Sequence, residues 1–289
     1  MNFGLGAYEM TLLTTIGIGV TLALSLNLIT GFCGQISLGH AAFYGTGAYT
    51  AAMLTKSGVP FLLAMLAGGA MAAAVGIIVG LASLRVRHDF LAITTMGVSF
   101  LFVGVVRKQE VLGGELGISG IPDHGFSKPG FMLLALAIAA AVALFSIYLK
   151  RSWMGYAFDS IADDEDTART VGIDVGQYKL TAFAFGTALA GIAGGLYAHQ
   201  VRFISPDSFG FIESITILSM VVVGGIGSVS GIIVAAVVLT MLPQWFQFIE
   251  DYKLLLYGGL LFAVMRFSPG GLAALTQNAV TRLRLREQT

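Results

Sequence analysis

The residues best suited to recognition or chemistry form a charged segment, 151–174, between two long apolar runs. Its centre carries four consecutive acidic residues, 163–166, with Ala162 before them and Ala168 shortly after. We expect a short helix here that Gly172 ends, because glycine readily adopts the left-handed conformation found just beyond a helix C-terminus. Such a helix fits a groove on a soluble partner, where small side chains insert and charges fix the register. A solvated loop with an aromatic anchor at a membrane surface explains the same residues equally well.

No other group of residues has the spacing of a known catalytic site. The sequence contains no Gly-Lys-Ser or Gly-Lys-Thr, so it lacks a phosphate-binding P-loop, and no Gly-x-Ser-x-Gly or His-Glu-x-x-His motif occurs. The single Cys33 excludes an internal disulfide and a cysteine-based metal site. The four histidines are too far apart for an i, i+4 pair: His40, His88, His124 and His199. We therefore expect no enzyme activity and neither a metal nor a cofactor bound by this chain.

The composition is typical of a membrane protein. Of the 289 residues, 56% are apolar and 11% are charged, against about 45–50% and about 25% in soluble domains. The 38 glycines and 11 methionines fit this class, because close helix packing in lipid favours small residues. Apolar runs of roughly twenty residues recur along the chain, and each can cross about 30 Å of hydrocarbon as a helix. The sequence therefore predicts an all-α, polytopic membrane helix bundle, with residues 1–289 as one transmembrane domain.

We expect about nine transmembrane helices. They fall near 8–29, 40–55, 61–83, 89–107, 131–149, 179–198, 212–224, 229–245 and 253–268. The second and seventh of these are short for a full crossing, and both adjoin Gly-rich breaks. The first run is expected to be a retained helix rather than a cleaved signal peptide, because no basic residue precedes it.

The basic residues predict the orientation, because cytoplasmic loops carry an excess of Lys and Arg. With 151–178 on the cytoplasmic side, the inner face receives Arg85, Arg87, Lys150, Arg151, Arg169, Lys179, Arg266, Arg282, Arg284 and Arg286. The outer face then receives Lys56, Arg107, Lys108, Lys128, Arg202 and Lys253. This arrangement places the N-terminus outside, the C-terminal tail inside, and 108–130 as the main periplasmic loop.

Two Gly-rich breaks, 31–40 and 224–231, interrupt pairs of apolar runs and approach from the same side. Paired interruptions in the two halves of a transporter indicate its transport path. Tight turns, in which glycine supplies left-handed backbone angles, explain the breaks as well.

Ionisable residues are nearly absent from the predicted helix centres, although ion-coupled carriers usually need them there. We therefore expect a partner protein to supply the driving force. Uncharged polar residues do occur in and beside the helices, and most such hydroxyls bond their own backbone. The candidates for a translocation path are Asn27, Gln35, Ser37, Thr94, Thr95 and Ser99.

Three motifs follow one another between about residue 22 and residue 272. The first is Leu26-Asn27-Leu28…Gly31…Gly34-Gln35-Ile36-Ser37-Leu38-Gly39-His40. The second is Glu165-Asp166-Thr167-Ala168…Gly172-Ile173 with Ala190-Gly191-Ile192-Ala193-Gly194-Gly195, and the third is Val223-Gly224-Gly225-Ile226-Gly227-Ser228. Their combination resembles the LivM-type permeases of branched-chain amino acid ABC importers.

This resemblance implies a heteromeric complex with a LivH-like second permease, two cytosolic ATP-binding cassette subunits that bind the ATP, and a periplasmic or extracellular substrate-binding protein. It also implies that the 155–172 part of the 151–178 segment is a coupling helix seated in a cleft of the ATPase. The coupling residues carried over by position are Gly155, Ala162, Asp163, Glu165, Asp166, Ala168 and Gly172. The acidic run at 163–166 departs from the family's usual pattern, which has an arginine there, and this argues against assembly with another system's ATPase.

The resulting expectation is a permease subunit of an ABC importer in the bacterial cytoplasmic membrane, surrounded by lipid and without a nucleic-acid partner. The expected substrates are branched-chain or related amino acids. The alternative is a stand-alone or ion-coupled facilitator of a small neutral solute such as urea or an amide.

Overall fold

The computed structural model describes residues 6–83, 88–245, 252–267 and 270–274. Among these residues, helices coincide within a few positions with all nine segments predicted from the sequence. They are α1 (Ala7–Asn27), α2 (His40–Lys56), α3 (Phe61–Ser83), α4 (His88–Lys108), α5 (Lys128–Lys150), α8 (Val175–Val201), α9 (Phe211–Gly224), α10 (Val229–Trp245) and α12 (Lys253–Phe267).

The nine helices do not all have the length and apolar composition of a complete membrane crossing. Seven stretches of the described chain are long and apolar enough to span a membrane. The two that fall short are α2, with 17 residues, and α10, whose apolar part covers Val229–Gln244. At 1.5 Å per residue, 17 residues extend about 26 Å, which is less than the roughly 30 Å of hydrocarbon.

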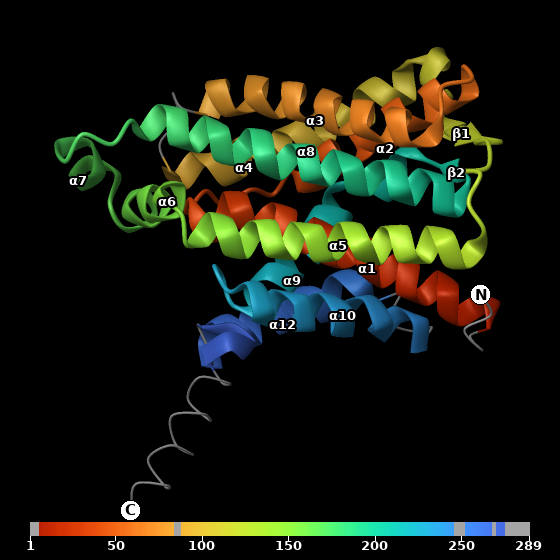
Figure 1. Ribbon diagram of the computed structural model, residues 1–289. Helices are drawn as coiled ribbons and strands as arrows, with labels where there is room; N and C mark the ends of the chain where they lie inside the picture. The colour runs from red at the N-terminus through yellow and green to blue at the C-terminus, as the bar shows by residue number, and fades with distance from the viewer. Residues whose placement is uncertain (1–5, 84–87, 246–251, 268–269, 275–289) are drawn as a thin grey trace, which may run out of the picture.

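Helix α1 occupies the centre of the bundle. It packs against α5, α8, α9 and α10. Of the residues in its most apolar stretch, 83% are buried inside the bundle. The group of α2, α3 and α8 lies on one side of α1, and α9, α10 and α12 lie on the other (Figure 1). Helices α2 and α8 approach backbone to backbone, because a Cβ atom on Gly47 would lie 2.2 Å from the Cα of Gly191. Such approaches provide the packing that holds membrane helices together.

The two ends of the bundle carry different structures. At one end lie the short helices α6 (Trp153–Asp163) and α7 (Glu165–Thr170), and the start of α1 lies at the other (Figure 1). The α6–α7 end carries Lys150, Arg151, Arg169 and Lys179, which are among the residues predicted for the inner face. Residues Arg85, Arg87, Arg282, Arg284 and Arg286, also predicted there, lie outside the described residues.

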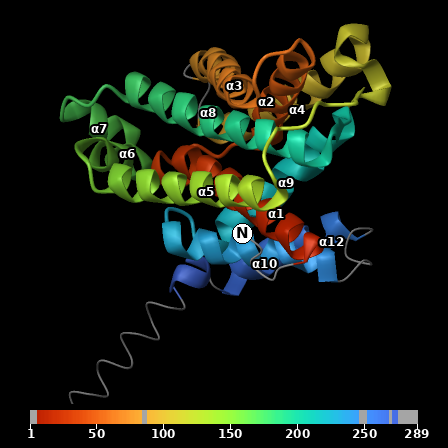
Figure 2. The same cartoon turned by 45° about the vertical axis from the view of Figure 1, so that its right-hand side comes forward.

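The predicted periplasmic loop is an ordered cap at the opposite end. It contains two short 3₁₀ helices, Glu110–Leu112 and Gly114–Leu116, and strand β1 (Ile118–Ser119). Strand β1 pairs antiparallel with β2 (Phe203–Ile204), which follows α8 (Figure 1). Figure 2 shows from a second side that α2 and α3 lie on one side of α5 and α1, and α10 and α12 on the other. The loop ends at residue 127 rather than 130, because the Ser127 hydroxyl accepts a hydrogen bond from the Gly130 amide and caps α5.

Candidate translocation path and coupling segment

The first Gly-rich break is a bend in the backbone deep inside the bundle. Helix α1 continues as a π-helical turn, Leu28–Phe32, and α2 begins at His40 after seven residues of irregular chain. The His40 Nε2 atom lies 2.7 Å from the Ser25 hydroxyl of α1, and both residues are fully buried. Helix α2 therefore starts beside α1 rather than at the membrane surface. Irregular backbone at such a depth is tolerated where protein surrounds it or where it lines a cavity.

Hydroxyl groups from three helices surround the start of α2. The Leu38 amide donates to Thr95 Oγ1 at 3.0 Å, and the Ala41 amide donates to Ser214 Oγ at 3.1 Å. The Ser99 and Ser214 hydroxyls lie 3.4 Å apart. We call the buried set Ser25, Ser37, His40, Thr95, Ser99 and Ser214 the α2-start cluster. Two of its polar atoms, Ser37 Oγ and His40 Nδ1, have no hydrogen-bond partner among the described residues.

The α2-start cluster contains three of the six path residues predicted from the sequence, namely Ser37, Thr95 and Ser99. Thr94 is half-buried and lies about 100° around α4 from Thr95, outside the cluster. Gln35 lies in the same break, where its backbone bonds to Ile29 and Thr30 and its side-chain amide lies 3.5 Å from Cys33 Sγ. Sequence reasoning missed the other three cluster members. For Ser214, the only signal was that the stretch Ser205-Pro206…Phe209…Ser214-Ile215, just before the third motif, also resembles the LivM-type permeases.

The second break meets the first. The Gly227 amide donates to Asn27 Oδ1 at 3.0 Å, and the Gly227 carbonyl accepts from Lys150 Nζ at 2.6 Å. A Cβ atom on Gly31 would lie 2.7 Å from the Gly227 nitrogen. We call Asn27, Gly31, Lys150 and Gly227 the break junction. Asn27, predicted to line the path, thus joins α1 to the connection between α9 and α10.

The coupling segment folds as two short helices with defined caps. The Ser152 hydroxyl accepts from the Gly155 amide at the start of α6. Asp164 Oδ1 accepts from the Thr167 amide at 2.6 Å at the start of α7, and this hydrogen bond lowers the pKa of Asp164 below its usual value. Gly172 has a φ of +87° and follows the end of α7, as predicted from its position.

The predicted coupling residues divide into a surface group and a supporting group. Ala162, Asp163, Asp166 and Gly172 are exposed. Gly155 and Ala168 are buried, so they hold the segment against the bundle and do not offer a surface to a partner. Glu165 is partly buried and forms an ion pair with Lys179 of α8. Lys179, which is 8% exposed, was not among the predicted coupling residues.

The coupling segment touches the first break directly. A Cβ atom on Gly34 would lie 3.0 Å from the Cα of Ala162, and α6 packs against the π-helical turn that ends α1. Movement of α6 would therefore displace the chain that leads into α2. No group of three or more His, Cys, Asp or Glu side chains able to hold a metal occurs in the described part of the chain.

Comparison with known proteins matches nearly the whole chain to transport permeases. Residues 9–265 match the family model described as "Branched-chain amino acid transport system / permease component". The chain is 34% identical to the high-affinity branched-chain amino acid transport system permease protein LivM of Escherichia coli K12, over 94% of this chain and 71% of that protein. It is 26% identical to the permease protein BraD of Pseudomonas aeruginosa, over 92% and 95%, and 24% identical to the permease protein LivH of Salmonella typhimurium, over 87% and 89%. No solved structure gives a significant match.

Proposed function

Since this chain belongs to the family of branched-chain amino acid transport system permease components, we propose that it forms one half of a translocation path for branched-chain or related amino acids. It is a multi-pass membrane protein of an ABC transporter family, and its matched relatives are transport permeases rather than enzymes. One observation carries the proposal further. The first break contacts the coupling segment at Gly34 and reaches the α2-start cluster at Leu38.

We place the path beside the α2-start cluster. Its side chains are five hydroxyls and one imidazole, with no Asp, Glu, Lys or Arg among them, so they suit a zwitterionic or neutral solute. The irregular backbone beside them supplies further polar groups without a buried ion, and buried ions are costly in a membrane. In this proposal Ser37, Thr95, Ser99 and Ser214 face the solute in at least one state of the transport cycle. Asn27 and Gln35 instead hold the breaks in shape.

We further propose that the exposed face of the coupling segment docks on an ATP-binding cassette subunit. Ala162, Asp163 and Asp166 would lie at that contact, and the Glu165–Lys179 ion pair would transmit its movement to α8. ATP, bound by two such subunits, changes which conformation of the permease is favoured, because a partner shifts an equilibrium only through its different affinity for the two states. A LivH-like second permease and a substrate-binding protein on the outer side complete the assembly in the bacterial inner membrane.

The test reverses the charge of the exposed face. The double variant Asp163→Lys/Asp166→Lys, co-expressed with its partner subunits, should lose leucine uptake and ATPase co-purification by tenfold or more. Glu115→Lys, an equally exposed reversal on the outer loop, should leave co-purification unchanged. Normal uptake and normal co-purification in the double variant would reject the docking role.

The alternative of a stand-alone facilitator makes a different prediction. The chain purified alone and reconstituted into vesicles would then carry saturable flux without ATP. The family membership argues for the opposite result, which is no flux until the partner subunits and ATP are added.

A further inference from the structure

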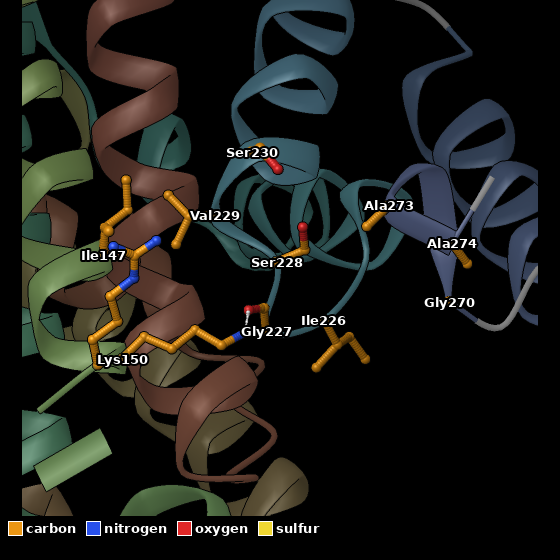
Figure 3. Close-up of a pocket in the computed structure, with 11 residues that line it drawn as sticks. Ile147, Lys150, Ile226, Gly227, Ser228, Val229, Ser230, Gly270, Ala273 and Ala274 are labelled. Atoms are coloured by element: carbon orange, nitrogen blue, oxygen red, sulfur yellow. Dashed lines mark hydrogen bonds between the residues drawn. The ribbon is translucent and has the colours of Figure 1, made fainter. Parts of the chain in front are cut away.

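A cavity of about 490 Å³ opens at the inner end of α5, where the first cytoplasmic charges of the coupling segment begin. Three parts of the chain form its walls: the end of α5, the connection from α9 into α10, and residues 270–274. Figure 3 shows Lys150 reaching Gly227, with Ser228, Val229 and Ser230 at the start of α10 and Gly270, Ala273 and Ala274 on the far wall. The transport function proposed above does not use this cavity.

Two positive charges border the cavity without a matching negative charge. No ion pair joins Lys150 or Arg151 to a carboxylate within the part of the chain that the structure describes. Lys150 bonds the Gly227 carbonyl and lies 5.7 Å from the Phe32 ring centre, so its charge is oriented but not neutralised. Asp159 of α6, which is exposed, interacts electrostatically with Lys150 but forms no ion pair with it.

The rest of the cavity is suited to an amphiphile that carries a phosphate. Ser228 and Ser230 place hydroxyl groups beside the cations, and the first amides of α10 contribute partial positive charge. The remaining walls are apolar, with Ile147, Ile226 and Val229 among them. The cavity lies at the end of the α5 membrane span, which is the depth of the lipid headgroups.

We propose that this cavity binds the headgroup phosphate of an anionic phospholipid of the inner leaflet. Basic pockets between transmembrane helices on the cytoplasmic side are the sites that such headgroups occupy. The apolar walls favour a lipid over a free phosphate, because a soluble anion gains nothing from them. The lipid phosphate lies beside the break junction, since Lys150 belongs to both.

The test measures lipid binding to the purified full-length chain in detergent by native mass spectrometry, with phosphatidylglycerol and phosphatidylcholine titrated separately. Each basic residue near an anionic surface contributes an attraction equivalent to about fivefold in affinity. Arg151→Gln should therefore raise the Kd for phosphatidylglycerol about fivefold, and Lys150→Gln/Arg151→Gln about 25-fold. The Arg151 side chain makes no hydrogen bond or ion pair to a described residue, and its backbone bonds to α5 do not depend on the side chain, so its variant should fold normally.

Lys128→Gln is the matched control, because it removes one exposed cation from the opposite end of the same helix. Its phosphatidylglycerol affinity should equal that of the unmodified chain, and phosphatidylcholine should bind all four proteins weakly and alike. Equal phosphatidylglycerol binding by every variant would overturn the site. Binding of glycerol 3-phosphate that displaces the lipid and shows the same dependence on Lys150 and Arg151 would overturn the lipid as its ligand.

Discussion

Replacing Lys179 with methionine should release α7 from the bundle. Lys179 is buried and pairs with the partly buried Glu165 across the junction of α7 and α8. Removing one partner of a fully buried pair costs about 3–5 kcal/mol. The Glu165 side chain keeps 20% exposure and also lies 3.7 Å from Arg169, so we reduce the expected cost to about 2 kcal/mol.

Such a cost changes the ratio of docked to released α7 about thirtyfold, since about 1.4 kcal/mol corresponds to a factor of ten. The assay is hydrogen exchange of the α7 amides in the purified full-length chain, and their exchange should accelerate by about that factor. The double variant Lys179→Met/Glu165→Met should exchange near the original rate, because replacing both partners with apolar groups leaves no unpaired charge.

Arg169→Gln serves as the control. The Arg169 side chain is exposed in both of its ion pairs, and pairs with an exposed partner contribute about 0–1 kcal/mol, so the rate should change less than about fivefold. An exchange rate in Lys179→Met within threefold of the original would refute the view that this ion pair holds the coupling segment. So would a double variant that exchanges as fast as the single one.

Three further variants test the breaks and the helix cap. Asn27→Leu leaves the partly buried Gly227 amide without its acceptor, a loss near the lower end of about 1–3 kcal/mol. The midpoint of thermal unfolding in detergent should fall, and an unchanged midpoint would contradict the break junction. Gly34→Ala places a side chain on a residue with φ +70° and against Ala162, which costs about 1–2 kcal/mol for the backbone alone. Uptake should fall while membrane insertion persists, and full uptake would contradict a tight contact between the first break and α6. Because the pKa of Asp164 is lowered, its ionised cap stabilises α7 above the unfolded pKa of about 4, and this stabilisation is lost as the pH falls from there through the folded pKa. Hydrogen exchange of α7 should accelerate in acid for the original chain, and Asp164→Asn, which keeps an uncharged cap, should weaken that acceleration, since Glu165 remains as a second carboxylate that holds α7.

The sequence predicts the elements of this molecule well, because each depends on local signals. Apolar runs locate the helices, and Gly172 marks the end of α7 through the left-handed angle that the structure contains. Errors at helix starts arise where a cap lies outside the apolar run. Asp174 accepts from the Gln177 amide and starts α8 at Val175, four residues before the predicted start, which was set by hydropathy.

The candidate site is harder to predict, because its members meet only in three dimensions. The Ser214 hydroxyl accepts from the Ala41 amide across 173 residues of sequence. A hydroxyl in a membrane helix usually bonds its own backbone, as Thr187 does. Residue type alone therefore does not distinguish such a hydroxyl from one that bonds another helix, as Ser214 does. Ala168 illustrates the other difficulty. In a helix of six residues, no apolar period is long enough to say which face turns inward.

The two Gly-rich breaks have a common physical reason. A helix interrupted inside a membrane exposes backbone groups that need partners, and for the second break here two neighbouring helices supply them. Asn27 satisfies the Gly227 amide, and Lys150 satisfies its carbonyl. Because Lys150 ends α5 directly before the coupling segment, the junction is bound to the part of the chain that we expect to move.

The length of the first break limits how a movement can spread. Gly34 contacts the coupling segment, and Leu38 donates to Thr95 in the α2-start cluster. Four residues separate them, so at most about 14 Å of extended chain connects the two contacts. In the proposed assembly, a displacement of α6 by an ATPase would therefore reach the polar cluster through a short piece of backbone, without passing along a whole transmembrane helix. Lengthening this connection by two glycines after Gly34 should preserve ATP hydrolysis by the assembled transporter and abolish uptake. Uptake that survives the insertion would require a different route, and α8, reached through Lys179, is the one the structure offers.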